Sequence, residues 1–189
     1  VAGLPQHQQK TGEEKKALPL DDMVVDVGMT GEGARQSVRI GDYMIFAEET
    51  VELLGDVLCG KAMDDRACVA SILYALELLK GAALKCDLVV SASTKEEQGG
   101  HGAMSLAYRE RPDLAVAVDV CHARTHDSVP ADVVFEWGEG PAVGIGANSR
   151  PKVARRVLEL ARAKEIPHQV KAIAGPSGTN AWAMQLAGE

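Results

Sequence analysis

Apolar runs alternate with amphipathic segments over residues 55–189, and this alternation constrains the fold more than any other feature. Residues 88–94 and 114–120 are apolar runs of strand length. Residues 65–80 and 152–164 carry apolar side chains at helical spacing. Apolar strands that are separated by helices form a mainly parallel sheet covered on both faces. The sequence therefore predicts an α/β domain.

Shorter patterns complete this reading. The chain begins with a polar stretch, and short β-branched runs split by Gly and Asp follow it, which is typical of β hairpins. These runs cover residues 23–28, 38–42, 43–46 and 50–54. Helices are also predicted over residues 102–109 and from residue 181 to 186, and strands over residues 132–137 and 169–174.

Composition excludes several classes of partner. The chain is 46% hydrophobic, which is enough for a core, and its formal charge of −7 argues against nucleic acid and anionic membranes as partners. No apolar run approaches the ~20 residues of a membrane span. The four cysteines have no CxxC spacing and lie in apolar surroundings. We expect buried, reduced thiols in a cytoplasmic protein.

Acidic residues stand where the predicted strands and helices begin or end. Asp64 opens a helix, Glu96 and Glu97 follow one strand, and Asp119 closes another. Ligands of parallel sheets bind beyond the carboxyl ends of the strands. Taken singly, Asp64 and Asp65 fit a helix N-terminus, and the glutamates fit a solvated loop. Taken together, the acidic positions favour a metal or catalytic site, because carboxylates bind hard cations and an unpaired buried carboxylate is costly.

Several motifs resemble those of one enzyme family. The ordered set closely resembles the glutamyl-aminopeptidase and cellulase M family of di-zinc metallopeptidases, which includes the tetrahedral aminopeptidases. The motifs of this set are GKAMDDR (60–66), TKEEQG (94–99), AVDV (117–120), GEGP (138–141) and GTN (178–180). The resemblance implies a three-layer αβα domain over residues 55–189. Residues 1–54 would be the C-terminal part of a small inserted β domain.

The resemblance also implies roles for the acidic residues. Asp64 would bridge two Zn²⁺ ions, with Co²⁺ as a second possible metal, and its peptide bond to Asp65 would be cis. Glu97 would bind one metal and Asp119 the other. Glu96 would be the general base, and Asp65 would be a second catalytic residue. The implied reaction removes an N-terminal residue from a peptide, as metal-bound hydroxide attacks the carbonyl.

The chain departs from the family pattern in four places. It has neither the His-x-Asp segment expected upstream nor the ligand histidine expected downstream, so we expect a fragment that is poorly active alone. Lys95 stands where the family has Gln, and Asn180 stands where it has Asp. His101 and Asn180 are the candidate substrate-binding residues.

The leading prediction is thus a cytoplasmic metallo-aminopeptidase that acts on short peptides. The family implies a homo-oligomer, with a dodecamer as one form. A related di-metal amide hydrolase, such as a deacylase, is the alternative within enzymes. A non-catalytic assembly or binding subunit that retains the fold is the alternative outside them.

Overall fold

The computed structural model describes residues 19–126, 128 and 135–187. The chain divides into two compact units, Val1–Glu48 and Glu49–Glu189, and each is described by itself. The assignment of residues 1–54 to an inserted β domain and of residues 55–189 to a catalytic domain stays a prediction.

The described part of the first unit holds a short 3-10 turn, η3 (Leu20–Asp22), and the helix α1 (Gly31–Ser37). The hydroxyl of Thr30 caps α1 by accepting a hydrogen bond from the Gly33 N–H at 3.2 Å. No strand forms between residues 19 and 48, so the hairpins predicted there are a wrong prediction.

Local hydrogen bonds explain that error. Asp26 accepts a bond from the Gly28 N–H, and Asp42 accepts one from the Arg39 N–H, each at 2.8 Å. Such aspartate turns compete with strand pairing for the backbone donors. The β-branched and aromatic side chains nearby stay exposed; Tyr43, for example, is 99% exposed. A strand without a bonded neighbour has no partner for its backbone groups.

The second unit opens with a hairpin of β1 (Val51–Leu53) and β2 (Val57–Cys59), which pair antiparallel. Gly55 and Asp56 connect them with positive φ angles of 82° and 59°. Both angles suit the tight hairpin turn that Gly and Asp favour.

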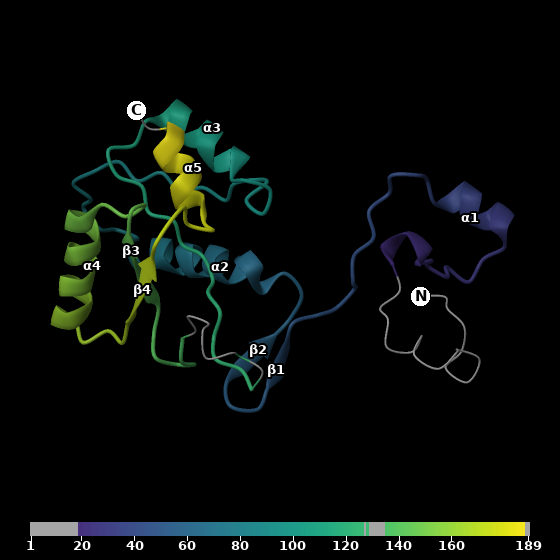
Figure 1. Ribbon diagram of the computed structural model, residues 1–189, viewed down its shortest axis with the longest axis horizontal. Helices are drawn as coiled ribbons and strands as arrows, with labels where there is room; N and C mark the ends of the chain where they lie inside the picture. Colours follow the sequence, from purple (N-terminus) through teal and green to yellow (C-terminus); the bar gives the residue numbers. More distant parts are fainter. Residues whose placement is uncertain (1–18, 127, 129–134, 188–189) are drawn as a thin grey trace. The chain divides into compact units, whose positions relative to one another are not determined.

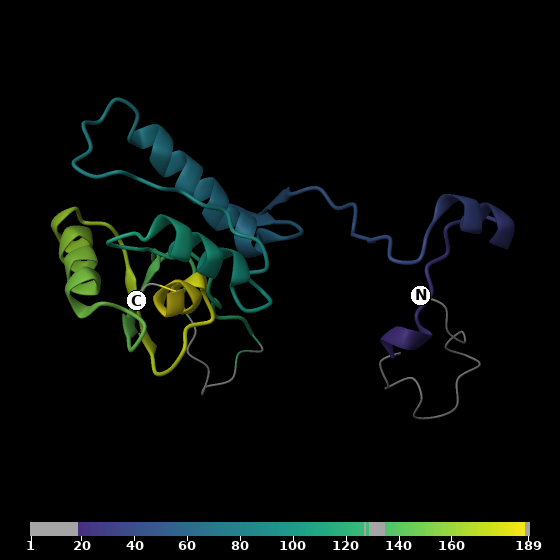
Figure 2. The same cartoon turned by 90° about the horizontal axis from the view of Figure 1, so that it is seen from above.

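Four helices follow, close to the predicted positions: α2 (Met63–Leu78), α3 (His101–Glu110), α4 (Pro151–Ala163) and α5 (Asn180–Ala187). The strands β3 (Ala142–Gly146) and β4 (Gln169–Ile173) pair in parallel, and α4 connects them. Figures 1 and 2 show α4 beside this pair and α3 beside α5. The α/β class with parallel pairing is therefore confirmed.

Two predicted strands of this unit do not form. Within the described residues, the segments 88–94 and 114–120 belong to no strand, while β3 and β4 bond only to each other. A parallel strand needs hydrogen-bonded neighbours, and without them the valines of these segments stay exposed, up to 67% at Val116. The sequence did not predict β3, because two of its five residues are glycine, which is depleted in strands. Of the strand predicted at 132–137, residues 132–134 lie outside the description, and Phe135 forms a single parallel bridge to Ala123.

The core is made mostly of small side chains. Ala103 and Ala107 on α3 and Ala183 on α5 are buried where these two helices pack closely. Of the four free cysteines only Cys68 is buried, so the expectation of buried thiols is wrong for the exposed residues Cys59, Cys86 and Cys121. Over the described residues, none of the helices has the length and apolar character that crossing a membrane requires.

Candidate functional site

Three aspartates form the centre of the site. One carboxylate oxygen from each of Asp64, Asp65 and Asp119 lies within 4.8 Å of the other two. We call this group the acidic triad. Asp64 and Asp65 lie in the first turn of α2, and the peptide bond between them is cis, as the sequence resemblance implied. Asp119 is half-buried, and its Oδ1 accepts a hydrogen bond from the Val120 N–H at 2.8 Å.

Two carboxyls of this site, Glu96 and Asp119, have raised pKa values. Burial raises the pKa of Glu96, and the negative charges of Asp119 and Glu97 raise it further. Burial likewise raises the pKa of Asp119; the Val120 hydrogen bond opposes this shift, and the charges of Asp65 and Asp64 add to it. Like charges gathered in this way disfavour the ionised carboxylates. The donor set therefore fits a divalent cation, whose preferred ligands are carboxylate oxygens.

Glu96 and Glu97 belong to what we call the glutamate loop, residues 93–100. Its backbone folds back on itself. The Gly100 N–H donates to the carbonyls of Lys95 and Glu96, at 3.0 and 3.1 Å, and the Gly102 N–H donates to Thr94 O at 3.1 Å. Lys95 adopts a φ of +58°, which places this non-glycine residue in the left-handed region. These bonds fix both glutamates relative to the start of α3.

A cavity of about 250 Å³ separates the glutamate loop from the first turn of α5. Glu96 and Glu97 line one wall, so Glu97 faces the cavity while lying outside the triad as the structure defines it. The other lining residues are Gly99, Gly100, Ser177, Gly178, Thr179, Trp182 and Ala183. An open space thus lies directly beside the two glutamates.

The α5 wall includes residues that the sequence reading missed. Ser177 is one of them. In the structure its N–H donates to Asn148 Oδ1 at 2.6 Å, and its hydroxyl lies 3.1 Å from that of Thr179. Trp182 supplies an aromatic surface. The signal was present in the GPSG turn (175–178), which overlaps the GTN motif, because loops and turns often carry functional residues.

The two candidate substrate-binding residues lie at helix starts. His101 is exposed at the first position of α3. Asn180 begins α5, and its Nδ2 donates to Ser93 Oγ at 3.1 Å. Neither belongs to the described lining of the cavity. Substrate binding by His101 and Asn180 therefore stays a prediction.

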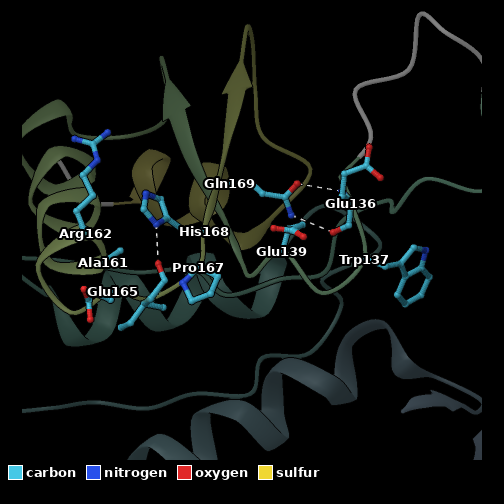
Figure 3. A pocket seen from close by; sticks show the side chains of 10 residues that line it. Glu136, Trp137, Glu139, Ala161, Arg162, Glu165, Pro167, His168 and Gln169 are labelled. Atoms are coloured by element: carbon cyan, nitrogen blue, oxygen red, sulfur yellow. Dashed lines mark hydrogen bonds between the residues drawn. The ribbon is translucent and has the colours of Figure 1, made fainter. Parts of the chain in front are cut away.

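A larger cavity, of about 940 Å³, contains none of the predicted site residues. It lies between the end of α4, the start of β4 and residues 136–139 (Figure 3). The amide of Gln169 bridges Glu136 and Gly140 there, and Glu136 also pairs with Arg124 at 2.6 Å. The smaller cavity, whose wall includes Glu96 and Glu97, is therefore the better candidate.

The chain is similar to several known proteins. The family model of the M42 glutamyl aminopeptidases matches residues 1–189. The lysyl aminopeptidase of Pyrococcus furiosus is 30% identical over 189 residues, which are 98% of this chain and 54% of that protein. The glutamyl aminopeptidase of Lactococcus lactis subsp. cremoris is 30% identical over 194 residues, covering 99% of this chain and 53% of that protein.

A solved structure is also similar. The Pyrococcus horikoshii TET1 peptidase, described as able to assemble into a tetrahedron or a large octahedral shell, superposes with a TM-score of 0.79 at 27% identity. The match covers 97% of this chain and 55% of that one. The chain thus spans about half the length of the relatives that it matches. The chain belongs to the M42 glutamyl aminopeptidase family.

Proposed function

We propose that this chain carries catalytic residues of a metal-dependent aminopeptidase, which removes N-terminal residues from short peptides. The observation that carries the proposal is the acidic triad together with the cavity whose wall includes Glu96. Family membership and the aminopeptidase names of the relatives support the same reaction class.

Two Zn²⁺ ions are the proposed cofactors, with Co²⁺ as a substitute. Asp64 is the proposed bridging ligand, and Glu97 and Asp119 are the proposed ligands of one ion each. When bound, such ions polarise a carbonyl and lower the pKa of a water molecule. The raised pKa values of Glu96 and Asp119 support cation binding here, because a nearby positive charge favours the ionised carboxylates.

The remaining chemistry falls to the chain's own side chains. Glu96 lies on the cavity wall, where it accepts the proton of the attacking water and returns it to the leaving amine. Asp65, the second proposed catalytic residue, is oriented by the Cys68 N–H, which donates to its Oδ1 at 3.3 Å. The cavity of about 250 Å³ restricts the substrate's position against Glu96.

Assembly into a homo-oligomer, in a dodecamer or a related form, is proposed from the structural relatives. One is described as a tetrahedral or octahedral assembly, and a second, 26% identical with a TM-score of 0.71, as a dodecamer. A cytoplasmic location is proposed because the cysteines Cys59, Cys68, Cys86 and Cys121 are free thiols.

Hydrolysis of paired substrates tests the reaction. The native protein, loaded with Zn²⁺ or Co²⁺, is given aminoacyl-p-nitroanilides with a free α-amine and the same compounds with the amine acetylated. We expect release of nitroaniline from the free amines only. Release of acetate from the acetylated compounds would instead identify a deacylase. Bound metal without turnover of either series would identify a binding subunit.

A further inference from the structure

Asn180 connects two elements of the site that are far apart in sequence. Its Nδ2 donates to the hydroxyl of Ser93 at 3.1 Å, and both residues are half-buried. Ser93 is the first residue of the glutamate loop and stands three positions before Glu96. Asn180 is the first residue of α5. The bond therefore ties the start of the glutamate loop to the start of the helix on the opposite wall of the cavity.

A second contact ties the other end of the same loop to the same helix. A methyl group added to Gly100 would lie 2.6 Å from Cβ of Ala183 and 3.3 Å from Oδ1 of Asn180. Gly100 is buried and has a φ of +67°. Only glycine fits this close approach without strain. The loop is thus anchored to α5 at residues 93 and 100, on both sides of Glu96.

The unused half of the Asn180 amide shows which group matters. Among the described residues, Asn180 Oδ1 is buried with no hydrogen-bond partner. A buried acceptor without a partner is unfavourable, so the Oδ1 atom gives no reason for an amide side chain at this position. The Nδ2 donor is the half that makes a contact. Asn180 is also absent from the described cavity lining, while its neighbour Thr179 belongs to it.

We propose that Asn180 is a positioning residue that acts through Ser93 to hold the glutamate loop, and with it Glu96, in place against the cavity. The role rests on the proposed function, and it is separate from the predicted substrate contact of Asn180. Displacement of Glu96 lowers the rate of proton transfer without removing a substrate contact, because proton transfer depends on hydrogen-bond geometry. The loss therefore falls on kcat rather than on KM.

A double-mutant cycle on the native protein tests this role. We expect Asn180→Ala and Ser93→Ala each to lower kcat by about tenfold, with KM within about twofold. The double variant should lose no more than either single variant, because both remove one bond. Ser93→Thr, which keeps the hydroxyl, should retain wild-type kcat. Gln185→Ala removes another side-chain bond of α5, to Asn148, and serves as the matched control. A rise in KM at constant kcat, or additive losses, would overturn the role.

Hydrogen exchange provides a readout that does not depend on turnover. The Gly102 N–H is bonded within the loop region. In Asn180→Ala and Ser93→Ala we expect exchange in residues 94–102 to accelerate by about tenfold or more, while α4 keeps its protection. If the two variants exchange as slowly as wild type in these residues, the positioning role is contradicted, whether or not the wild-type protein is an active peptidase. Faster loop exchange in a protein without peptidase turnover would leave the anchor standing and reject the aminopeptidase.

Discussion

The backbone N–H of Cys68 donates a hydrogen bond to Oδ1 of Asp65 at 3.3 Å, one helical turn into α2. The Cys68 thiol also bonds to the Asp65 side chain. Burial is the largest cause, and this bond the second, of a rise in the Cys68 pKa to about 12; the charges of Asp65, Asp119 and Asp64 add to it. The thiol beside the triad is therefore neutral at physiological pH, so a fourth negative charge is avoided.

Cysteine alkylation tests this environment. At pH 8, iodoacetamide should label the exposed Cys59 well before the buried Cys68, because the thiolate is the reactive form. Mass spectrometry of the labelled peptides from metal-free protein measures both rates. Cys59 is the internal control for reagent activity. Equal rates at the two positions would contradict the burial and the raised pKa of Cys68.

The stability of the metal-free protein should fall as pH rises. Glu96 and Asp119 have folded-state pKa values above their ordinary values, so above ~4 the native state binds more protons than the unfolded state. The free energy of unfolding therefore decreases with pH until both carboxyls are ionised in the folded protein. Urea unfolding between pH 4 and 8 in the presence of a chelator measures the slope.

Asp119→Asn supplies the comparison for that slope. The substitution removes one of the two carboxyls with a raised pKa, and it takes a negative charge away from Glu96. The free energy of unfolding should therefore decrease less steeply with pH. Added Zn²⁺ should flatten the wild-type decline as well. A stability that rises over this pH range in the chelated wild type would show that these carboxyls are not destabilised in the fold.

Gly100→Ala should destabilise the protein by about 1–3 kcal/mol, because the new methyl group would lie 2.6 Å from Ala183 Cβ on a backbone with positive φ. Gly175→Ala is the matched control, since nothing lies within 4 Å of a methyl group added there. We expect the control to stay within about 0.5 kcal/mol of wild type. Denaturant midpoints measure both, and equal midpoints for the two variants would show that α5 does not pack tightly on the loop.

Helices and the acidic positions were predictable from sequence, whereas only some strands were. The prediction over residues 169–174 is confirmed by β4, while those over residues 88–94 and 114–120 are wrong. The positions of α2 and α4 follow from local signals in the sequence. Both helices have apolar side chains at helical spacing, and a glycine marks the end of α2. Pairing depends on a distant neighbour. Val89 and Val116 have the composition of strand residues, yet no described strand bonds to them.

The site shows the same division. Their placement at the ends of predicted strands and helices indicated Asp64 and Asp119, with Asp65 beside the first, and the structure brings these three together. Ser93 and Trp182 escaped notice because their importance comes from contacts over long sequence distances. The Asn180–Ser93 bond spans 87 positions, and no local pattern reports such a contact.

Asp119→Asn should also weaken metal binding. Loss of a proposed direct ligand is expected to lower Zn²⁺ affinity by at least about tenfold, since even outer-shell changes cost that much. Asp113→Asn, an exposed aspartate nearby in sequence, should leave the affinity unchanged. Competition with a chromophoric chelator measures both variants. Wild-type affinity in Asp119→Asn would remove Asp119 from the ligand set.

The role of Glu96 is tested most directly by its amide isostere. In the native protein, Glu96→Gln should retain bound metal and lower kcat for an aminoacyl-p-nitroanilide by about 10²–10⁴-fold, because the amide does not accept the proton. Glu52→Gln, an exposed change on β1, should keep wild-type turnover. Metal content and kcat are measured on the same preparations. Full metal with lost turnover supports Glu96 as the general base; full metal with wild-type turnover in Glu96→Gln would contradict it.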